Sequence, residues 1–397
     1  MRLLANSTLN TTSISLPPVE SSDPSSLSYT NNIDDDNDND SDPRLLKLKK
    51  LLYNDECCNM NELRKLSWVG VPWKHRPAAW KLLIGLVPAI KTKRESVLQN
   101  RSLDYRNLIE QYYKSKSEND DIYRQIHIDI PRMQPLLSLF QQQIVQEIFE
   151  RILYIWSIRH PASGYVQGMN DLVTPFFVTY LSEYVPGNRF EDVESFDLSS
   201  LSQVVLDSIE SNSYWSFSKL LDSIQDNYTF AQPGIQKLVR QLEVVVSRVD
   251  NPLHAHLLEN GVEYLQFAFR WMNNLLIREI HLRCIIRLWD TYLSEGAINA
   301  TFVPSSSSSV NDSSDLLTNT TWSIDSGTPF STSFHLFVCA AFLRYWSKSL
   351  LLEKDFQGLM LKLQNLPTYH WSEKEVKFLV ADAYQMKSQF SPNHLKV

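Results

Sequence analysis

Apolar side chains recur at steps of three and four along most of this chain, which is the spacing of an α-helix with a buried face. The clearest example is Ile144, Ile148, Ile152 and Ile155, which predict a buried helix near the middle of the chain. No stretch alternates apolar and polar residues as a half-buried strand does. The pattern therefore predicts an all-α fold of many helices.

The same spacing predicts further helices on both sides of this one. Pro77 suits the first turn of a helix in which Trp80 faces inward. A helix is expected to begin near Ser213, after an acidic, serine-rich connector at 191–202. Further helices are expected over residues 44–53, within 101–125, at 171–184, around 267–271 and 287–290, and over 333–349, 356–363 and 373–386.

Composition divides the chain into segments. Residues 1–43 are rich in Ser, Asn, Thr, Pro and Asp, and predict a disordered acidic tail. Residues 44–60 form a basic lead-in with a short amphipathic helix, whose leucines either pack on the following domain or touch an acidic membrane surface. Residues 61–390 carry the helical pattern of one large domain. A serine-rich, low-complexity stretch at 298–332 interrupts this domain and is interpreted as an insertion.

Charge and cysteine usage argue against two classes of function. A net charge of −7 gives nucleic-acid binding no electrostatic support. The four cysteines, Cys57, Cys58, Cys284 and Cys339, form no C-x-x-C pair, so no metal site is predicted. We expect reduced thiols in an intracellular protein.

The first candidate for chemistry is Arg132. Pro131 and Pro135 flank it and stiffen the segment, because each proline fixes its own φ and restricts the residue before it. Asp129 lies three residues earlier and would share a face with Arg132 if the turn is helical, so the two are expected to pair. A guanidinium held in this way suits a phosphate. The alternative is an ordinary surface salt bridge beside a helix start.

The second candidate is Gln167, in the segment Gly164-Tyr165-Val166-Gln167-Gly168. Glycines allow a tight turn or the close approach of another backbone. A neutral amide both donates and accepts hydrogen bonds, so it can orient a water molecule. The alternative is a loop glutamine that caps the following helix.

Together, and in this order, the two segments resemble the signature motifs of the TBC-domain Rab GTPase-activating proteins. The motifs are Ile126-x-x-Asp129-x-x-Arg132 and Tyr165-x-Gln167-Gly168. The resemblance implies that the arginine and the glutamine are catalytic fingers, inserted in trans into a GTP-bound Rab GTPase. It also implies supporting roles for the aspartate, which would hold the arginine, and for the tyrosine and the glycine beside the glutamine.

The resemblance extends along the domain. The block at 63–85 is similar to the opening motif of the family, in which Arg76 and Trp80 would be mainly structural. Leu86 stands where the family often has an aromatic residue, a difference in packing that leaves the site untouched. The later blocks look closest to the Golgi-associated branch of the family.

The resemblance also implies what the chain itself does not bind. GTP and Mg²⁺ would belong to the Rab partner, so no cofactor is expected here. The chain would stimulate another protein's hydrolysis in vesicle trafficking and turn over no substrate of its own. It would be cytoplasmic and reach Golgi or early secretory membranes only by peripheral recruitment. Nothing in the sequence fixes an oligomeric state.

Two other functions remain as alternatives. The first is a Rab-binding or scaffold module of the same fold that does not accelerate hydrolysis. The second is a serine hydrolase built from His160, Ser163 and Asp171. The surroundings of Ser163 are not a G-x-S-x-G elbow and no strand precedes it, which disfavours the hydrolase.

Overall fold

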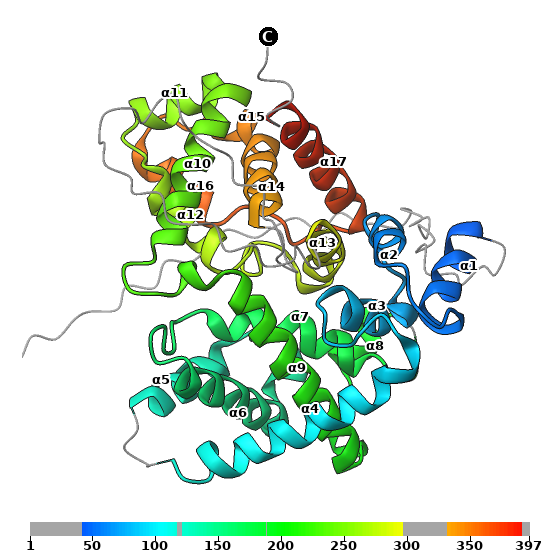
Figure 1. Cartoon of the computed structure of the whole chain (residues 1–397). Helices are drawn as coiled ribbons and strands as arrows, with labels where there is room; N and C mark the ends of the chain where they lie inside the picture. Colours follow the sequence, from blue (N-terminus) through cyan, green and yellow to red (C-terminus); the bar gives the residue numbers. More distant parts are fainter. Residues whose placement is uncertain (1–41, 117–120, 188, 297–331, 391–397) are drawn as a thin grey trace, which may run out of the picture. The chain divides into compact units, whose positions relative to one another are not determined.

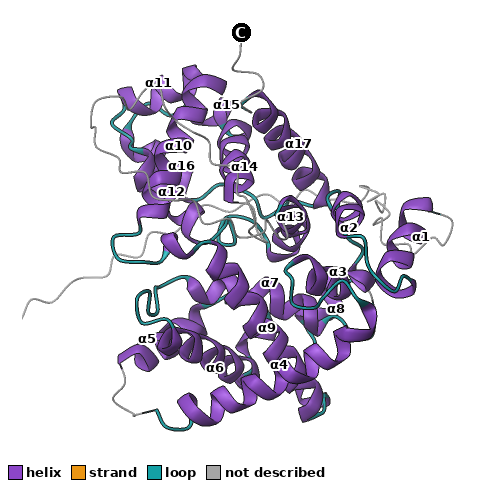
Figure 2. Cartoon of the chain, viewed as in Figure 1, coloured by secondary structure: helices purple, strands orange, loops and turns teal. Residues whose placement is uncertain are grey.

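The computed structural model describes residues 42–116, 121–187, 189–296 and 332–390. Their regular structure is helical, apart from one isolated β-bridge between Cys57 and Ile90 (Figures 1 and 2). The predicted all-α class is therefore confirmed. Nearly all of the predicted acidic tail and of the predicted insertion at 298–332 lies outside the described residues.

The lead-in segment packs on the domain. Helix α1 covers Pro43–Lys49 and continues as a π-helix over Lys50–Asn54. Asp42 caps its first turn, because its carboxylate accepts a 2.8 Å hydrogen bond from the Arg44 backbone. The buried leucines of this segment are Leu45, Leu48, Leu51 and Leu52. Their burial supports the packing alternative and not the membrane one.

The opening of the domain is joined to a helix far along the chain. Helices α2 (Met60–Ser67) and α3 (Arg76–Leu83) lie against α13 (Leu282–Glu295). Asp290 of α13 is fully buried and accepts hydrogen bonds from the Arg76 guanidinium, the Trp80 indole (2.6 Å) and a backbone N–H. A buried carboxylate needs this many partners to offset its desolvation, so these contacts fix the position of α3 on α13.

The central helices carry the predicted buried segment. Helix α6 buries Ile148, Ile152 and Ile155, so the predicted buried helix is confirmed. Helix α9 begins ten residues before the predicted start at Ser213, because Leu206 and Ile209 extend its buried face through the serine-rich sequence. The central helices are α4 (Arg94–Leu108, with a π-helical end at Ile109–Tyr113), α5 (Asp121–Asp129), α6 (Gln143–Arg159), α7 (Met169–Leu181), α8 (Phe190–Glu194) and α9 (Gln203–Ser223).

Helix α7 contains Pro175, which has no N–H to donate to the carbonyl of Asp171 one turn earlier. The hydroxyl of Thr174 supplies the missing hydrogen bond, at 2.7 Å. The helix therefore continues through the proline with every residue buried.

The remaining helices pack around α10 and α14. Contacts join α14 to α17 and to α10, and α10 to α12 (Figure 1). Of the helices that the structure describes, none combines the length and the apolar character needed to cross a bilayer. The helices not yet introduced are α10 (Pro233–Val249), α11 (Asn251–Glu259), α12 (Tyr264–Asn273), α14 (Thr332–Tyr345), α15 (Ser347–Leu350), α16 (Phe356–Gln364) and α17 (Glu373–Gln389).

Candidate functional site

Arg132 stands at the end of α5. The helix gives way at Ile130 to one 3₁₀ turn, Ile130–Arg132, and Met133 then turns to extended backbone. Ile130 and Met133 are buried, and they anchor the turn on both sides of the arginine. Arg132 itself is exposed, and among the described residues its guanidinium has no hydrogen-bond or ion-pair partner.

Asp129 does not pair with Arg132 as expected. The carboxylate is buried and accepts hydrogen bonds from the Tyr165 hydroxyl at 3.0 Å and from the Gln125 amide at 3.3 Å. Two neutral donors satisfy the carboxylate inside the protein, while the arginine points to solvent. Asp129 therefore joins the arginine segment to the glutamine segment.

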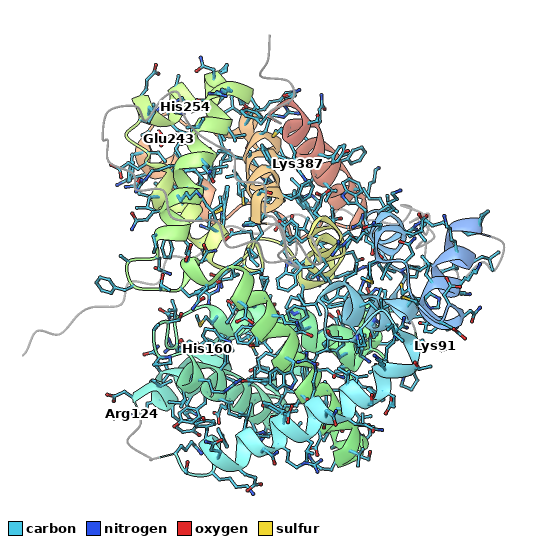
Figure 3. The ribbon with its side chains drawn as sticks, in the orientation of Figure 1. Lys91, Arg124, His160, Glu243, His254 and Lys387 are labelled. Atoms are coloured by element: carbon cyan, nitrogen blue, oxygen red, sulfur yellow. The ribbon has the colours of Figure 1, made fainter. Side chains whose placement is uncertain are left out.

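Gln167 lies on the connection between α6 and α7. His160, labelled in Figure 3, stacks on Trp156 with ring centroids 4.2 Å apart and fixes the end of α6. The chain then turns through Gly164, with φ of +62°, and Gly168, with φ of +100°. Gln167 is exposed, and its side-chain amide has no hydrogen-bond partner in the described part of the chain.

Burial controls the protonation of Tyr165. Desolvation raises its pKa well above the ordinary value, and the nearby Asp129 carboxylate raises it further. The hydroxyl therefore stays neutral and donates to Asp129. This hydrogen bond connects the two segments that carry Arg132 and Gln167.

Two asparagines at the end of α12 hold the backbone beside Gln167. The Asn273 amide donates to the carbonyl of Gln167 at 3.4 Å. The Asn274 amide donates to the carbonyl of Gly168 at 3.0 Å and to the carboxylate of Asp171 at 2.9 Å. A Cβ on Gly168 would lie 2.9 Å from each of these side-chain amides, so glycine is needed there for close approach as well as for its φ.

Arg278 also helps to hold this loop, and together Asn273, Asn274 and Arg278 form what we call the clamp. Its Nε donates to the Asp171 carboxylate at 2.6 Å. Burial raises the pKa of Asp171, and Arg278 and Asn274 act in the opposite direction. Asn273, Asn274 and Arg278 were missed in the sequence analysis. Two amides directly after an apolar helix are the signal that could have indicated them.

The family now follows from comparison with known proteins. The profile of the Rab-GTPase-TBC domain family matches residues 74–307. The chain belongs to this family. Its TBC domain is also similar to the crystal structure of the Ypt/Rab-GAP domain of Gyp1p, with a TM-score of 0.75 and 40% identity. That match covers 88% of this chain and 98% of the solved chain.

Two TBC1 domain family members are among the similar proteins. TBC1 domain family member 22B from Homo sapiens is 55% identical over 358 residues, which cover 89% of this chain and 63% of the relative. Member 22A from Homo sapiens is 51% identical over the same share of this chain and 62% of its own length. GTPase-activating protein GYP1 from Saccharomyces cerevisiae is 40% identical over 87% of this chain and 59% of that protein. The chain thus spans about 63% of the length of the first of these relatives.

Arg76 and Trp80, the two residues of the opening motif, are buried. Arg76 is buried between Asp290 and the ring of Trp73, whose centroid is 4.4 Å from the guanidinium carbon. Trp80 packs between Phe176 and Trp289 in the core. Both lie in the core of the TBC domain, where they serve its packing.

The hydrolase alternative finds no support in the geometry of the TBC domain. Asp171 is taken up by Arg278 and Asn274, and Nδ1 of His160 is 2.7 Å from the carbonyl of Trp156. No side-chain hydrogen bond joins Ser163 to His160 or to Asp171 in the described residues. The three residues therefore form no nucleophile–base pair.

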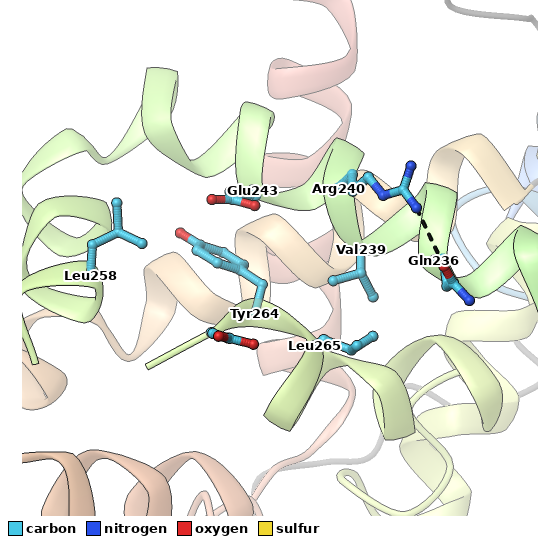
Figure 4. Close-up of a pocket in the computed structure, with 8 residues that line it drawn as sticks. Gln236, Val239, Arg240, Glu243, Leu258, Tyr264 and Leu265 are labelled. Carbon is cyan, nitrogen blue, oxygen red and sulfur yellow. Dashed lines mark hydrogen bonds between the residues drawn. The ribbon is translucent and has the colours of Figure 1, made fainter. Parts of the chain in front are cut away.

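The TBC domain also has a pocket of about 300 Å³ between α10, α11 and α12 (Figure 4). None of the site residues above lines it. The residues that line it are Gln236, Val239, Arg240, Glu243, Leu258, Glu263, Tyr264 and Leu265. The candidate site is therefore a pair of exposed side chains on fixed loops, which suits action on a macromolecular partner.

Proposed function

We propose that this chain is a GTPase-activating protein for a Rab family small GTPase, with Arg132 and Gln167 inserted in trans. One observation carries the proposal. Two exposed side chains without partners in the described residues stand on loops that the 3.0 Å hydrogen bond from Tyr165 to Asp129 joins. The name of the relative from Saccharomyces cerevisiae, GTPase-activating protein GYP1, supports the activity.

Arg132 would stabilise the charge that develops during GTP hydrolysis. Its guanidinium is always charged and presents a planar fork of donors to phosphate oxygens. An arginine supplied in trans is worth about 10³–10⁵ in rate, which corresponds to about 4–7 kcal/mol of barrier. Because no side chain of the described residues competes for it, the guanidinium is available to the partner's β- and γ-phosphates.

Gln167 would orient the attacking water molecule. Its amide can accept a hydrogen bond from the water and donate one to a phosphate oxygen at the same time. The backbone carbonyl of the same residue is held by Asn273, so the side chain starts from a fixed position. A fixed starting position lowers the entropic part of the barrier.

The partner would supply everything else that the reaction needs. GTP and Mg²⁺ would be bound by the Rab protein, and this chain would turn over no substrate of its own. We further propose that the chain acts in vesicle trafficking at Golgi or early secretory membranes, with peripheral recruitment from the cytoplasm. The competing function is a Rab-binding scaffold of the same fold without acceleration.

The test is GTP hydrolysis by a panel of purified Rab proteins. The variants are Arg132→Ala, Arg132→Lys and Gln167→Ala, with Arg124→Ala as the matched control. Arg124, labelled in Figure 3, lies on α5, just before the 3₁₀ turn that carries Arg132, and is also exposed, but it pairs with Asp121. Its loss removes one positive charge from the neighbouring helix without removing the proposed finger.

We expect the wild type to accelerate one or a few Rab proteins. Arg132→Ala should lower the rate by about 10³-fold or more, and Arg132→Lys should restore little of it, since lysine lacks the fork. Arg124→Ala should behave like the wild type. Binding to Rab proteins without acceleration, or full activity of Arg132→Ala, would favour the scaffold instead.

A further inference from the structure

Two large apolar side chains of this domain are almost fully exposed to solvent. Phe230 is 96% exposed and Leu136 is 95% exposed, the highest values among the large hydrophobic side chains of the described residues. Single exposed apolar residues are common on protein surfaces. Their position relative to the two fingers is what makes this pair informative.

Leu136 is exposed on the same segment as Arg132. It lies four residues after Arg132, at the third position of a turn that the Leu137 N–H closes on the carbonyl of Gln134 at 3.0 Å. Pro135 occupies the second position, where its fixed φ suits such a turn. Leu136 is therefore held at the tip of a rigid turn.

Phe230 is exposed on a loop that is connected to the loop of Gln167. It lies on the connection between α9 and α10, two residues after Tyr228, which is buried and donates to the Asn273 carbonyl at 2.6 Å. Gln232 secures the other side of the loop by donating to the carbonyl of Asn227 at 3.0 Å. Phe230 projects from between these two anchors.

Asn273 connects this loop to the glutamine finger. Its carbonyl accepts from Tyr228, and its side-chain amide donates to the carbonyl of Gln167. The loop that carries Phe230 and the loop that carries Gln167 are thus positioned by the same residue. Each proposed finger thus has an exposed apolar side chain near it. Leu136 lies on the same segment as Arg132, and Phe230 lies on the loop that Asn273 connects to Gln167.

Backbone strain is concentrated in the same places. The described residues contain five non-glycine residues with φ in the left-handed region, and all five belong to the arginine segment, the Phe230 loop or the turn after α12. Such conformations are costly and persist where the surrounding structure enforces them, often at functional sites. The five residues are Gln134, Ala231, Gln232, Leu275 and Leu276.

We propose that Leu136 and Phe230 are two apolar anchors that bind the switch segments of the GTP-bound partner. This inference rests on the proposed function. Fingers that reach the β- and γ-phosphates must approach the switch segments, which the γ-phosphate and Mg²⁺ hold in order. Apolar tips next to the fingers then contact those segments. Side chains of this kind, desolvated at the centre of an interface, carry much of its affinity.

The anchors should govern binding and not the chemical step. The variants are Leu136→Ala and Phe230→Ala, and the matched controls are Leu352→Ala and Phe378→Ala, whose side chains are exposed on other parts of the domain. Hydrolysis is measured over a range of concentrations of the GTP-bound Rab protein. Affinity is measured separately with the same Rab protein loaded with a non-hydrolysable GTP analogue or with GDP.

We expect each anchor variant to raise KM by about tenfold to a hundredfold, as for the loss of one buried side chain, with kcat within about twofold. Affinity for the GTP-analogue form should fall by the same factor, and the matched controls should leave both unchanged. Unchanged KM and affinity in the anchor variants would overturn the inference, as would a loss of kcat alone.

Two further results separate the explanations. If Arg132→Ala retains full activity while the anchor variants weaken binding, the proposed function fails and the docking surface stands. If Arg132→Ala is inactive and the anchor variants bind normally, only the docking surface fails. Sedimentation with phosphatidylcholine–phosphatidylserine vesicles tests the membrane alternative, and weaker sedimentation of Phe230→Ala with normal Rab affinity would overturn the proposal.

Discussion

Gly168 and Gly164 offer a matched test of how the glutamine loop is held. Both have positive φ, but their surroundings differ. A Cβ on Gly164 would meet nothing within 4 Å, whereas a Cβ on Gly168 would lie 2.9 Å from the amides of Asn273 and Asn274. Substituting each by alanine therefore separates the cost of the backbone conformation from the cost of breaking the clamp.

The magnitudes follow from these surroundings. Gly164→Ala should cost only the left-handed conformation, about 1–2 kcal/mol. Gly168→Ala places an alanine at a φ of +100°, well outside the ordinary left-handed region, and this conformation costs about 1–3 kcal/mol of strain. It also displaces two amides whose hydrogen bonds are worth about 1 kcal/mol each. We therefore expect a loss of about 3–5 kcal/mol if the loop stays in place.

The loop can escape this strain by moving, and activity then reports the movement. A displacement of about 1 Å in a positioning group costs about a hundredfold in rate. We expect Gly168→Ala to lower kcat by about this factor and Gly164→Ala to stay within a few-fold of the wild type. Urea unfolding and single-turnover hydrolysis by a responsive Rab protein measure the two quantities. Equal stability and equal activity of the two variants would refute the role of the clamp.

Three other changes test the surrounding structure. Tyr165→Phe should lower activity and destabilise the fold by about 1.5–3 kcal/mol, because Asp129 loses its 3.0 Å donor; activity and urea unfolding measure this. Asp290→Ala should cost about 3–5 kcal/mol by leaving the buried Arg76 unpaired, and an unchanged unfolding midpoint would contradict it. Burial lowers the pKa of His335 from 6.5 to about 4, so the unfolded chain binds more protons between these values. Stability should fall on the order of 3 kcal/mol as pH drops through this window, and His335→Gln should flatten the pH profile.

The sequence alone determined the local features of this protein. Apolar spacing predicted the helical fold and located α6, α7, α14, α16 and α17, because a helix reports its buried face through the residues within a few turns. The two motifs pointed to Arg132 and Gln167 and to the family. Even the local pattern failed at α9, where serine-rich composition concealed a helix that begins at Gln203 and has its first buried side chain at Leu206.

Only the tertiary structure decided how the candidate site is held. The expected partner of Asp129 was Arg132, three residues away, but the carboxylate accepts from Gln125 and from Tyr165, the latter 36 positions away. The hydrogen bond from Asn274 to Gly168 spans 106 positions, and neither residue shows a periodic signal that names the other. The exposure of Leu136 and Phe230 was equally hidden, since an apolar residue in a loop has the same identity whether it is buried or displayed. Contacts between distant segments depend on how the helices pack, and packing is a property of the whole core.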